Sequence, residues 1–281
     1  MATNMRIGFA GMGIMGAPMA MHLLQAGYPL TVFNRSQEKC EPLVAKGAKK
    51  AASFEQLLGS SDVVICMLAD AAALIQCLEQ VTGEVEAQGI INMGTIGPGE
   101  SSLVRERVAS LGLHYLEAPV AGSKPAAEAG QLVVLGSGET EWFERVAPVL
   151  SCFSKQVFYC GSGNLACVLK LSLNSLLASM TVALCESLAL CEQSGVAPND
   201  FFDVLAVTAL NAPLYDIKRP LIQNRNYPVQ FPLMHMLKDL NLARELLELP
   251  LLSASHQQYS QAALQRNEQD YDMSVVREML P

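Results

Sequence analysis

The chain has 281 residues, of which 51% are hydrophobic and 16% charged, and its formal net charge at pH 7 is −8. This length allows one large domain or two ordinary ones, and the composition excludes an intrinsically disordered chain. The acidic balance argues against a non-specific nucleic-acid binder, which needs a basic surface, but it leaves room for a locally basic anion site.

The chain carries eight cysteines and four histidines, and neither set has the spacing of a metal site. No CxxC or CxH pair occurs. The pattern predicts reduced, mostly buried thiols in a cytoplasmic protein and no structural metal.

The N-terminal segment predicts a nucleotide-binding turn. The apolar run from Ile7 to Leu24 is interrupted by glycines and Pro18, so it makes a poor signal peptide. Residues 5–10 are expected to form a strand, 17–27 a helix and 30–34 a second strand. A G-x-G-x-x-G motif lies between the first strand and the helix, and its residues are the expected cofactor contacts: Gly11, Met12, Gly13, Ile14, Met15 and Gly16.

Each glycine of this motif has a physical role in dinucleotide binding. Gly11 allows the tight turn, Gly13 lets the backbone approach a pyrophosphate, and Gly16 lets the helix pack closely on the strand. The helix N-terminus then offers free N–H groups to the phosphates. The alternative is a glycine turn with a purely structural role.

The end of the second strand bears on the choice between NAD and NADP. An NAD site usually has Asp or Glu there, but this chain has Asn34, Arg35 and Ser36. No acid is present to repel a 2′-phosphate, and a guanidinium and a hydroxyl are available to bind one. The sequence therefore favours NADP(H) over NAD(H), with an ordinary polar loop as the alternative.

Strands and helices alternate up to about residue 160. Strands are expected at 63–67, 89–93, 114–117, 132–136 and 156–159, and helices at 71–81, 100–111 and 141–150. The strand ends at Met67-Leu68 and Gly94-Thr95 should lie at the carboxyl edge of a parallel sheet, where ligands bind. Met67, Leu68 and Thr95 are therefore candidates for the cofactor site.

No strand pattern follows Gly161. Residues 164–194 should form one long helix stopped by Gly195. Further helices are expected at 198–205, 214–223 (interrupted by Pro220), 233–247, 254–267 and 274–279. The predicted fold is an α/β Rossmann domain with a mostly parallel sheet (residues 1–162) and an all-helical domain (163–281), joined by a long interdomain helix.

The long helix contains a lysine in apolar surroundings. Its apolar positions run almost all the way round, which predicts burial on most faces. Lys170 lies between two leucines, and Asn174 lies one turn further along the same face. A buried ammonium is costly, so these residues indicate chemistry; the alternative is a snorkelling surface lysine. Because the helix also carries Glu186 and Glu192, we interpret it as a core helix and not as a membrane span.

Two other stretches combine polarity with small or apolar residues. Residues 117–131 should form a small-residue loop whose backbone N–H groups could hold an anion. Residues 231–239 place Lys238 and Asp239 within a helix that is apolar on one side.

With these motifs in view, the whole chain resembles the β-hydroxyacid dehydrogenase family, which includes 3-hydroxyisobutyrate dehydrogenases, tartronate semialdehyde reductase and the glyoxylate/succinic semialdehyde reductases. The resemblance rests on the glycine turn at 8–16, the loop at 118–123, and a G-x-x-G-x-G-x-x-x-K-x-x-x-N signature matched by Gly161, Lys170 and Asn174. An F-x-L-x-x-x-x-K-D pattern at 231–239, with Gly-Ser-Lys at 122–124, favours the glyoxylate/succinic semialdehyde reductase branch.

The resemblance implies a role for each matched residue. Lys170 would be the general acid of reduction and the base of the reverse reaction, and a desolvated ammonium suits this because its pKa falls toward the working pH. Asn174 would orient Lys170 or bind the substrate. Gly122 and Ser123 would hold the substrate carboxylate, and Thr95 would contact both the nicotinamide and the substrate. Lys238 would face the cofactor, while Phe231 and Asp239 would close the site over the substrate.

Three positions depart from the family pattern. Ala121 replaces the usual serine, and Asn164 and Ala166 replace two glycines of the signature. Bulk at 164 and 166 is expected to narrow the site. These changes affect the expected specificity more than the reaction type.

The sequence leaves several functions open. The first is an NADPH-dependent reductase of a small aldehyde acid, and the second is a 3-hydroxyisobutyrate dehydrogenase. An imine reductase would commonly lack the lysine, and so would a non-catalytic NADP-binding scaffold or sensor. The apolar second domain and the resemblance predict a homo-oligomer, a dimer or tetramer, with no nucleic-acid or membrane partner.

Overall fold

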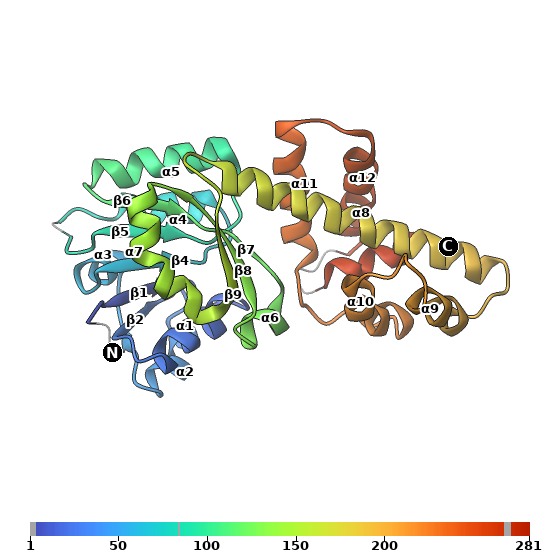
Figure 1. Ribbon diagram of the computed structural model, residues 1–281, viewed down its shortest axis with the longest axis horizontal. Coiled ribbons are helices and arrows are strands. Elements are labelled where there is room, and N and C mark those ends of the chain that lie inside the picture. Colours follow the sequence, from blue (N-terminus) through green and yellow to red (C-terminus); the bar gives the residue numbers. More distant parts are fainter. Residues whose placement is uncertain (1–3, 84, 267–270) are drawn as a thin grey trace. The chain divides into compact units, whose positions relative to one another are not determined.

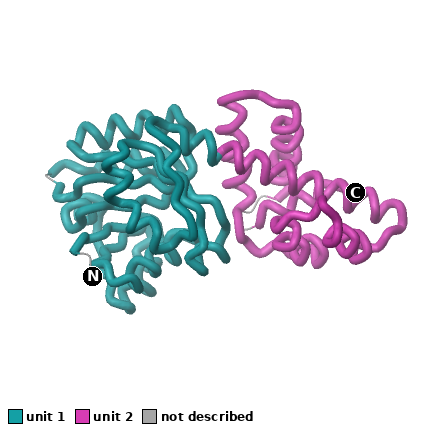
Figure 2. Tube along the Cα trace, viewed as in Figure 1, with its two compact units in different colours: residues 1–170 teal, residues 171–281 magenta. Residues whose placement is uncertain are grey.

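The computed structural model describes residues 4–83, 85–266 and 271–281. The chain forms two compact units, residues 1–170 and 171–281 (Figure 2). The division falls inside the long helix α8 (Leu165–Gln193), later than the predicted boundary at 162/163. It falls there because Cys167 packs in a core cluster of the first unit, whereas Leu171 and later residues pack in the core of the second.

The first unit is built on one mixed sheet (Figure 1). Its strand order is β3-β2-β1-β4-β5-β6-β8-β7, with β9 paired to β8. The strands from β3 to β6 are parallel, β8 is antiparallel to β6 and β7, and β9 is parallel to β8. Their bounds are β1 Ile7–Ala10, β2 Leu30–Phe33, β3 Lys49–Lys50, β4 Val63–Cys66, β5 Gly89–Asn92, β6 His114–Glu117, β7 Val120–Ala121, β8 Leu132–Gly138 and β9 Ser154–Tyr159.

Helices cover both faces of this sheet. Successive residues of a strand point to opposite faces, and Ile65 and Cys66 accordingly belong to different core clusters. Helices α1 and α7 supply one cluster, while α3, α4 and α5 supply the other. The bounds are α1 Gly16–Gln25, α2 Glu41–Val44, α3 Phe54–Gly59, α4 Ala71–Glu79, α5 Pro98–Ser110, α6 Lys124–Glu128 and α7 Thr140–Leu150, with 3₁₀ turns η1 Gln37–Cys40 and η2 Ser151–Phe153.

The second unit is helical. Most of α8 packs with the helices that follow it around a single apolar core. These are α9 Pro198–Ala206, α10 Pro213–Gln223, α11 Leu233–Leu246, α12 Pro250–Gln265 and the 3₁₀ segment η3 Met273–Met279. Together with the mixed sheet of the first unit, this confirms the predicted fold class, a Rossmann domain followed by an all-helical domain.

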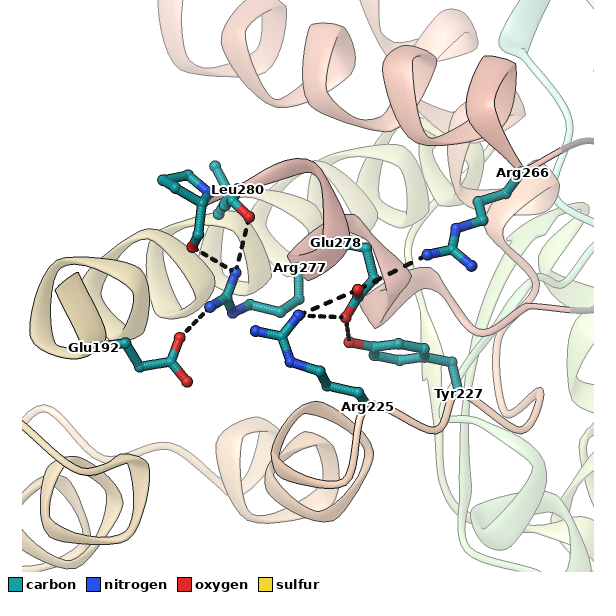
Figure 3. A network of polar contacts seen from close by, with 8 residues as sticks. Glu192, Arg225, Tyr227, Arg266, Arg277, Glu278 and Leu280 are labelled. Atoms are coloured by element: carbon teal, nitrogen blue, oxygen red, sulfur yellow. Dashed lines mark hydrogen bonds and ion pairs between the residues drawn. The ribbon is translucent and has the colours of Figure 1, made fainter.

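Ion pairs fix the C-terminal segment to this helical core (Figure 3). The buried guanidinium of Arg277 pairs with Glu192 near the end of α8 and also donates to the backbone oxygens of Leu280 and Pro281. Glu278 accepts hydrogen bonds from Arg225 and Tyr227. Since a buried charge is costly without a partner, these contacts hold η3 in one position.

Several element predictions need correction. The loop expected at 117–131 contains β7 and α6, because small residues there still pair with β8 and form one helical turn. Helix α10 continues through Pro220, whose neighbours Leu221 and Ile222 are buried. Helix α12 begins at Pro250 and not at 254, and the last helix is a 3₁₀ segment. The strand β3, the short helix α2 and the turn η1 were not predicted.

Helix α8 is less buried than its composition predicts. It is the one helix among the described residues that is long and apolar enough to cross a membrane, and half of its most apolar window is buried inside the protein. Leu165, Leu169, Leu173 and Leu176 are exposed and recur at helical spacing. The helix therefore buries one side and presents an apolar stripe on another.

Candidate active site

The glycine turn lies between β1 and α1 as predicted. Gly11 adopts a φ of 100°, and a Cβ there would overlap the carbonyl oxygen of Met67. A Cβ on Gly16 would overlap the carbonyl oxygen of Gly11. Gly13 is different, since a Cβ there would meet nothing within 4 Å. The outer glycines are thus required by packing, whereas the space over Gly13 is open to a ligand.

The side chain of Asn34 ties the glycine turn to the end of β2. Its Oδ1 accepts a hydrogen bond from the Met12 N–H at 2.9 Å, and its Nδ2 donates to the Ser36 oxygen at 2.9 Å. Arg35, between them, is exposed. Asn34 therefore shapes the turn, and the positive group at this strand end faces solvent.

The ends of the neighbouring strands meet at the same edge of the sheet. Met67 and Leu68 follow β4, and Gly94 and Thr95 follow β5, the next strand in the sheet. A Cβ on Gly94 would lie 2.6 Å from the carbonyl oxygen of Leu68, so the two loops are in close contact. The structure thus brings Met67, Leu68 and Thr95 to the edge that also carries the glycine turn.

Gly122 and Ser123 connect β7 to α6. Gly122 has a φ of 127°, and a Cβ there would crowd Leu132 and Ala126. Ser123 is the N-cap residue of α6, with extended backbone. Ala121, the departure from the family pattern, ends β7 beside Val133 of β8. A strand and a helix thus frame this turn, and it is not an open loop.

Lys170 is buried, with 7% of its surface exposed, and lies in the second turn of α8. One turn later, Asn174 is also buried, and its Nδ2 donates to Asp239 Oδ2 at 2.6 Å. The other oxygen of Asp239 pairs with Lys238 at 2.8 Å. Asp239 therefore holds the Asn174 amide in one orientation, a relation that the sequence did not predict.

Phe231 precedes α11 in the second unit. Its N–H donates to Asp272 Oδ2 at 2.9 Å, and the other oxygen of Asp272 pairs with the buried Lys218 at 2.7 Å. Its partly buried ring packs against the core of that unit. The backbone of Phe231 is thus fixed by a buried ion pair that sequence reasoning missed.

A second group missed from the sequence surrounds Glu117, which is fully buried. Its carboxylate accepts hydrogen bonds from Asn92 Nδ2 at 2.9 Å, Ser101 Oγ at 2.7 Å and Tyr115 Oη at 2.6 Å. Burial raises the pKa of Glu117 to about 7, and these hydrogen bonds oppose the rise. Asn92 and Glu117 end the neighbouring strands β5 and β6 and are paired in register. The one signal in the sequence was a polar residue at the end of each of these two strands.

The Glu117 cluster supports the loop that carries Thr95. Asn92 Nδ2 donates to the Gly94 oxygen, and Asn92 Oδ1 accepts from the Gly94 N–H, both at 3.2 Å. The carboxylate thus orients the amide, and the amide closes the turn before Thr95.

Comparison with known proteins identifies the family. Residues 6–161 match the model of the NAD binding domain of 6-phosphogluconate dehydrogenase, and residues 161–280 match that of the NAD-binding domain of NADP-dependent 3-hydroxyisobutyrate dehydrogenase. The chain is 37% identical to the chloroplastic glyoxylate/succinic semialdehyde reductase 2 of Arabidopsis thaliana, over 98% of this chain and 79% of that protein. It is 33% identical to glyoxylate/succinic semialdehyde reductase 1 of the same plant, over 92% of each. The chain belongs to the β-hydroxyacid dehydrogenase family.

A solved member of this family has the same fold. The structure of 3-hydroxyisobutyrate dehydrogenase from Mycobacterium tuberculosis with L-serine matches at a TM-score of 0.86 and 26% identity, over 99% of both chains. The present chain is therefore an NAD(P)-dependent oxidoreductase. The prediction of a nicotinamide cofactor from the glycine turn is thus confirmed, without distinction between NAD and NADP.

Gly13 and Gly16 of the turn should respond differently to replacement by alanine. We expect Gly13→Ala to leave the melting temperature unchanged and to weaken cofactor binding at least about tenfold, because the added methyl occupies open space that the pyrophosphate needs. Gly16→Ala should lower the melting temperature, because its methyl overlaps the Gly11 backbone. Thermal unfolding and cofactor titration of both variants check this, and a stable Gly16→Ala protein would contradict it.

Glu117 should make stability depend on pH. Between pH 4.5 and about 7 the unfolded chain loses this proton while the folded protein keeps it. The unfolded state then binds fewer protons, so the free energy of unfolding should fall by about 3 kcal/mol as pH rises through this window, and then stay level. Glutamine cannot titrate, and its amide can still pair with Asn92 and the two hydroxyls. Denaturant unfolding at pH 5 and 8 should therefore show a smaller pH effect in Glu117→Gln than in the unmutated protein; equal effects would contradict the assignment.

Proposed function

We propose that this dehydrogenase reduces a small aldehyde acid of the glyoxylate or succinic semialdehyde type with NADPH, and that Lys170 donates the proton. The single observation that carries the proposal is the buried Lys170 ammonium in α8, followed one turn later by an asparagine that Asp239 orients. Burial keeps this ammonium away from bulk water, as a group that passes its proton to a bound substrate requires.

The proton and the hydride have separate sources in this scheme. The nicotinamide cofactor supplies the hydride when it is bound. Lys170 gives its proton to the carbonyl oxygen as negative charge develops there, and takes it back in the oxidation direction. Asn174 orients Lys170 or binds the substrate, and in either role its own orientation is set by Asp239.

The cofactor is proposed to lie along the carboxyl edge of the parallel strands. Open space over Gly13 fits a pyrophosphate, and the N-terminus of α1, which has no side-chain cap, fits its charge. NADP(H) is proposed over NAD(H) because Arg35 is exposed at the end of β2 and Ser36 follows it, with no acid at position 34. Met67, Leu68 and Thr95 would then lie along the rest of the cofactor.

The proposed substrate carries both a carboxylate and an aldehyde group. The turn at Gly122 and Ser123 is proposed to bind the carboxylate through backbone N–H groups and the serine hydroxyl, with Thr95 contacting the reacting end. Asp239 and Phe231 are proposed to contact the substrate, and Lys238 the cofactor, as the resemblance predicts. The names of the two Arabidopsis relatives support glyoxylate and succinic semialdehyde as the substrates.

A second candidate is oxidation of 3-hydroxyisobutyrate to methylmalonate semialdehyde. The likeness to the Mycobacterium tuberculosis 3-hydroxyisobutyrate dehydrogenase favours it. Lys170 would then act as the base, so the two candidates share one site and differ in substrate and direction.

A substrate panel tests the proposal. Glyoxylate, succinic semialdehyde and tartronate semialdehyde are assayed with NADPH and NADH, and 3-hydroxyisobutyrate with NADP and NAD. The highest kcat/KM is expected for glyoxylate or succinic semialdehyde with NADPH. A higher value for 3-hydroxyisobutyrate would favour the second candidate, and no turnover of any of the four would refute both.

We also propose that the protein is a cytoplasmic homo-oligomer that binds neither membranes nor nucleic acids. The exposed leucine stripe on α8 supports an oligomer, because contiguous apolar surface is typical of interfaces. Eight free thiols support a reducing compartment. Light scattering of the purified protein should give the mass of a dimer or tetramer, and the mass of one chain would contradict the first part.

A further inference from the structure

Asn164 connects the beginning of α8 to the beginning of α5. Its Nδ2 donates to the Pro98 oxygen at 2.6 Å and to Ser102 Oγ at 2.8 Å. Its Oδ1 accepts from Arg105 at 2.6 Å. The amide nitrogen and the amide oxygen of Asn164 thus both bond to residues of α5. A glycine, which the family signature has here, would make none of these three bonds.

Arg105 strengthens the same connection. The nitrogen that binds Asn164 also donates to the Gly163 oxygen at 2.7 Å. The guanidinium lies over the ring of Tyr115, 5.7 Å from its centroid, and the Tyr115 hydroxyl donates to Glu117. We call the bonds of Asn164 to Pro98, Ser102 and Arg105 the Asn164 clamp. Through Arg105 and Tyr115 this clamp is continuous with the buried cluster around Glu117.

Both ends of the loop that carries Thr95 are held by this network. Asn92 fixes Gly94 at the loop's start, and Glu117 fixes Asn92. At its other end the loop runs into Pro98, the first residue of α5, whose oxygen accepts from Asn164. The Thr95 loop and the residue that precedes α8 thus share one set of hydrogen bonds.

The first turn of α8 is anchored at three points, all in the first unit. Besides Asn164, the Ala166 N–H donates to Ser137 Oγ at 3.3 Å, and the Cys167 side chain is buried beside the Glu117 cluster. Lys170 follows three residues after Cys167, on the same continuous helix. Because a helix is stiff, fixing the first turn of α8 also fixes the direction in which the Lys170 side chain projects from the helix.

We propose that Asn164 is a positioning residue for proton transfer: its clamp to Pro98, Ser102 and Arg105 sets the direction of Lys170 relative to the loop that carries Thr95. The inference rests on the proposed role of Lys170 as proton donor. A displacement of about 1 Å at a reacting group can lower the rate by up to about 100-fold, so a loosened clamp should affect the rate more than binding.

The test is a double-mutant cycle between Asn164→Gly and Lys170→Ala, read as kcat, KM and NADPH affinity with the best substrate of the panel. Asn164→Gly should lower kcat about tenfold with NADPH affinity within about twofold of the unmutated value. Because Asn164→Gly loses three hydrogen bonds to α5, thermal unfolding is measured alongside to check that the variant stays folded. In the Lys170→Ala background the same change should lower kcat no further, because no lysine remains to be positioned.

Two further variants sharpen the result. Ser162→Gly adds flexibility to the same segment at an exposed residue and should leave kcat near the unmutated value. Asn164→Asp keeps the acceptor for Arg105 and loses the two donated bonds, so its kcat should lie between those of Asn164→Gly and the unmutated protein.

The outcomes separate this inference from the proposed function. If Lys170→Ala abolishes turnover but Asn164→Gly has a normal kcat, the positioning role is wrong and the proton donor stands. If Asn164→Gly lowers kcat equally in both backgrounds, Asn164 is merely structural. If Lys170→Ala retains normal turnover, the proposed function fails and the inference fails with it.

Discussion

Replacing Lys170 with alanine is expected to lower kcat for aldehyde-acid reduction at least about 100-fold while the protein stays folded. The rate should fall because no other group then protonates the carbonyl oxygen at that position. The fold should survive because Lys170 lies inside the long helix α8, where alanine is the most favourable replacement for the helical backbone. Steady-state kinetics with saturating NADPH, together with thermal unfolding, measure the two effects.

Lys155→Ala is the matched control, because Lys155 is exposed on β9 and should leave kcat unchanged. Near-normal turnover in Lys170→Ala would contradict the proposal that Lys170 donates the proton. A melting temperature far below that of the control would mean that Lys170 has a structural role instead.

Replacing Arg35 with aspartate should abolish the preference for NADPH. The exposed guanidinium at the end of β2 would bind the 2′-phosphate, and a carboxylate there would repel it. Since a hydrogen bond to a charged group contributes about 1.5–3 kcal/mol, the ratio of kcat/KM for NADPH over NADH should fall about 10- to 100-fold. Initial rates with each cofactor give this ratio.

Lys39→Asp separates a local contact from a general charge effect. Lys39 is exposed in η1, four residues after Arg35, and the change in net charge is the same. The ratio should stay near that of the unmutated protein in this control. If the unmutated protein had equal kcat/KM for NADPH and NADH, Arg35 could not be the residue that selects NADPH through its 2′-phosphate.

Most strands and helices could be predicted because the sequence signals that mark them are local. Buried four-residue strands such as Val63–Cys66 and capping glycines such as Gly195 mark their elements without knowledge of neighbours. The direction of β8 could not be predicted, because a buried apolar strand looks the same in a parallel and an antiparallel pair. The strand β7 and the helix α6 are too short and too rich in small residues to show a period.

Part of the candidate site could likewise be predicted from local sequence. The glycine turn could be placed because nearby backbone leaves no room for a side chain at Gly11 and Gly16. The Glu117 cluster could not, because its members come from two strands and a helix and meet only through register. Asn164 was expected to narrow the site by its bulk, whereas its side chain binds the first turns of α5. A polar residue in place of glycine can thus serve as a tether.

The most direct test of the central claim, that Lys170 is the proton donor, is the pH dependence of kcat/KM for reduction, measured for the unmutated protein and for Lys170→Ala. A general acid must be protonated to act, so the unmutated protein should lose activity tenfold per pH unit above a single apparent pKa. Lys170→Ala, assayed at higher protein concentration, should lack that descending limb. The same limb in both proteins would show that another group donates the proton and would contradict the mechanism.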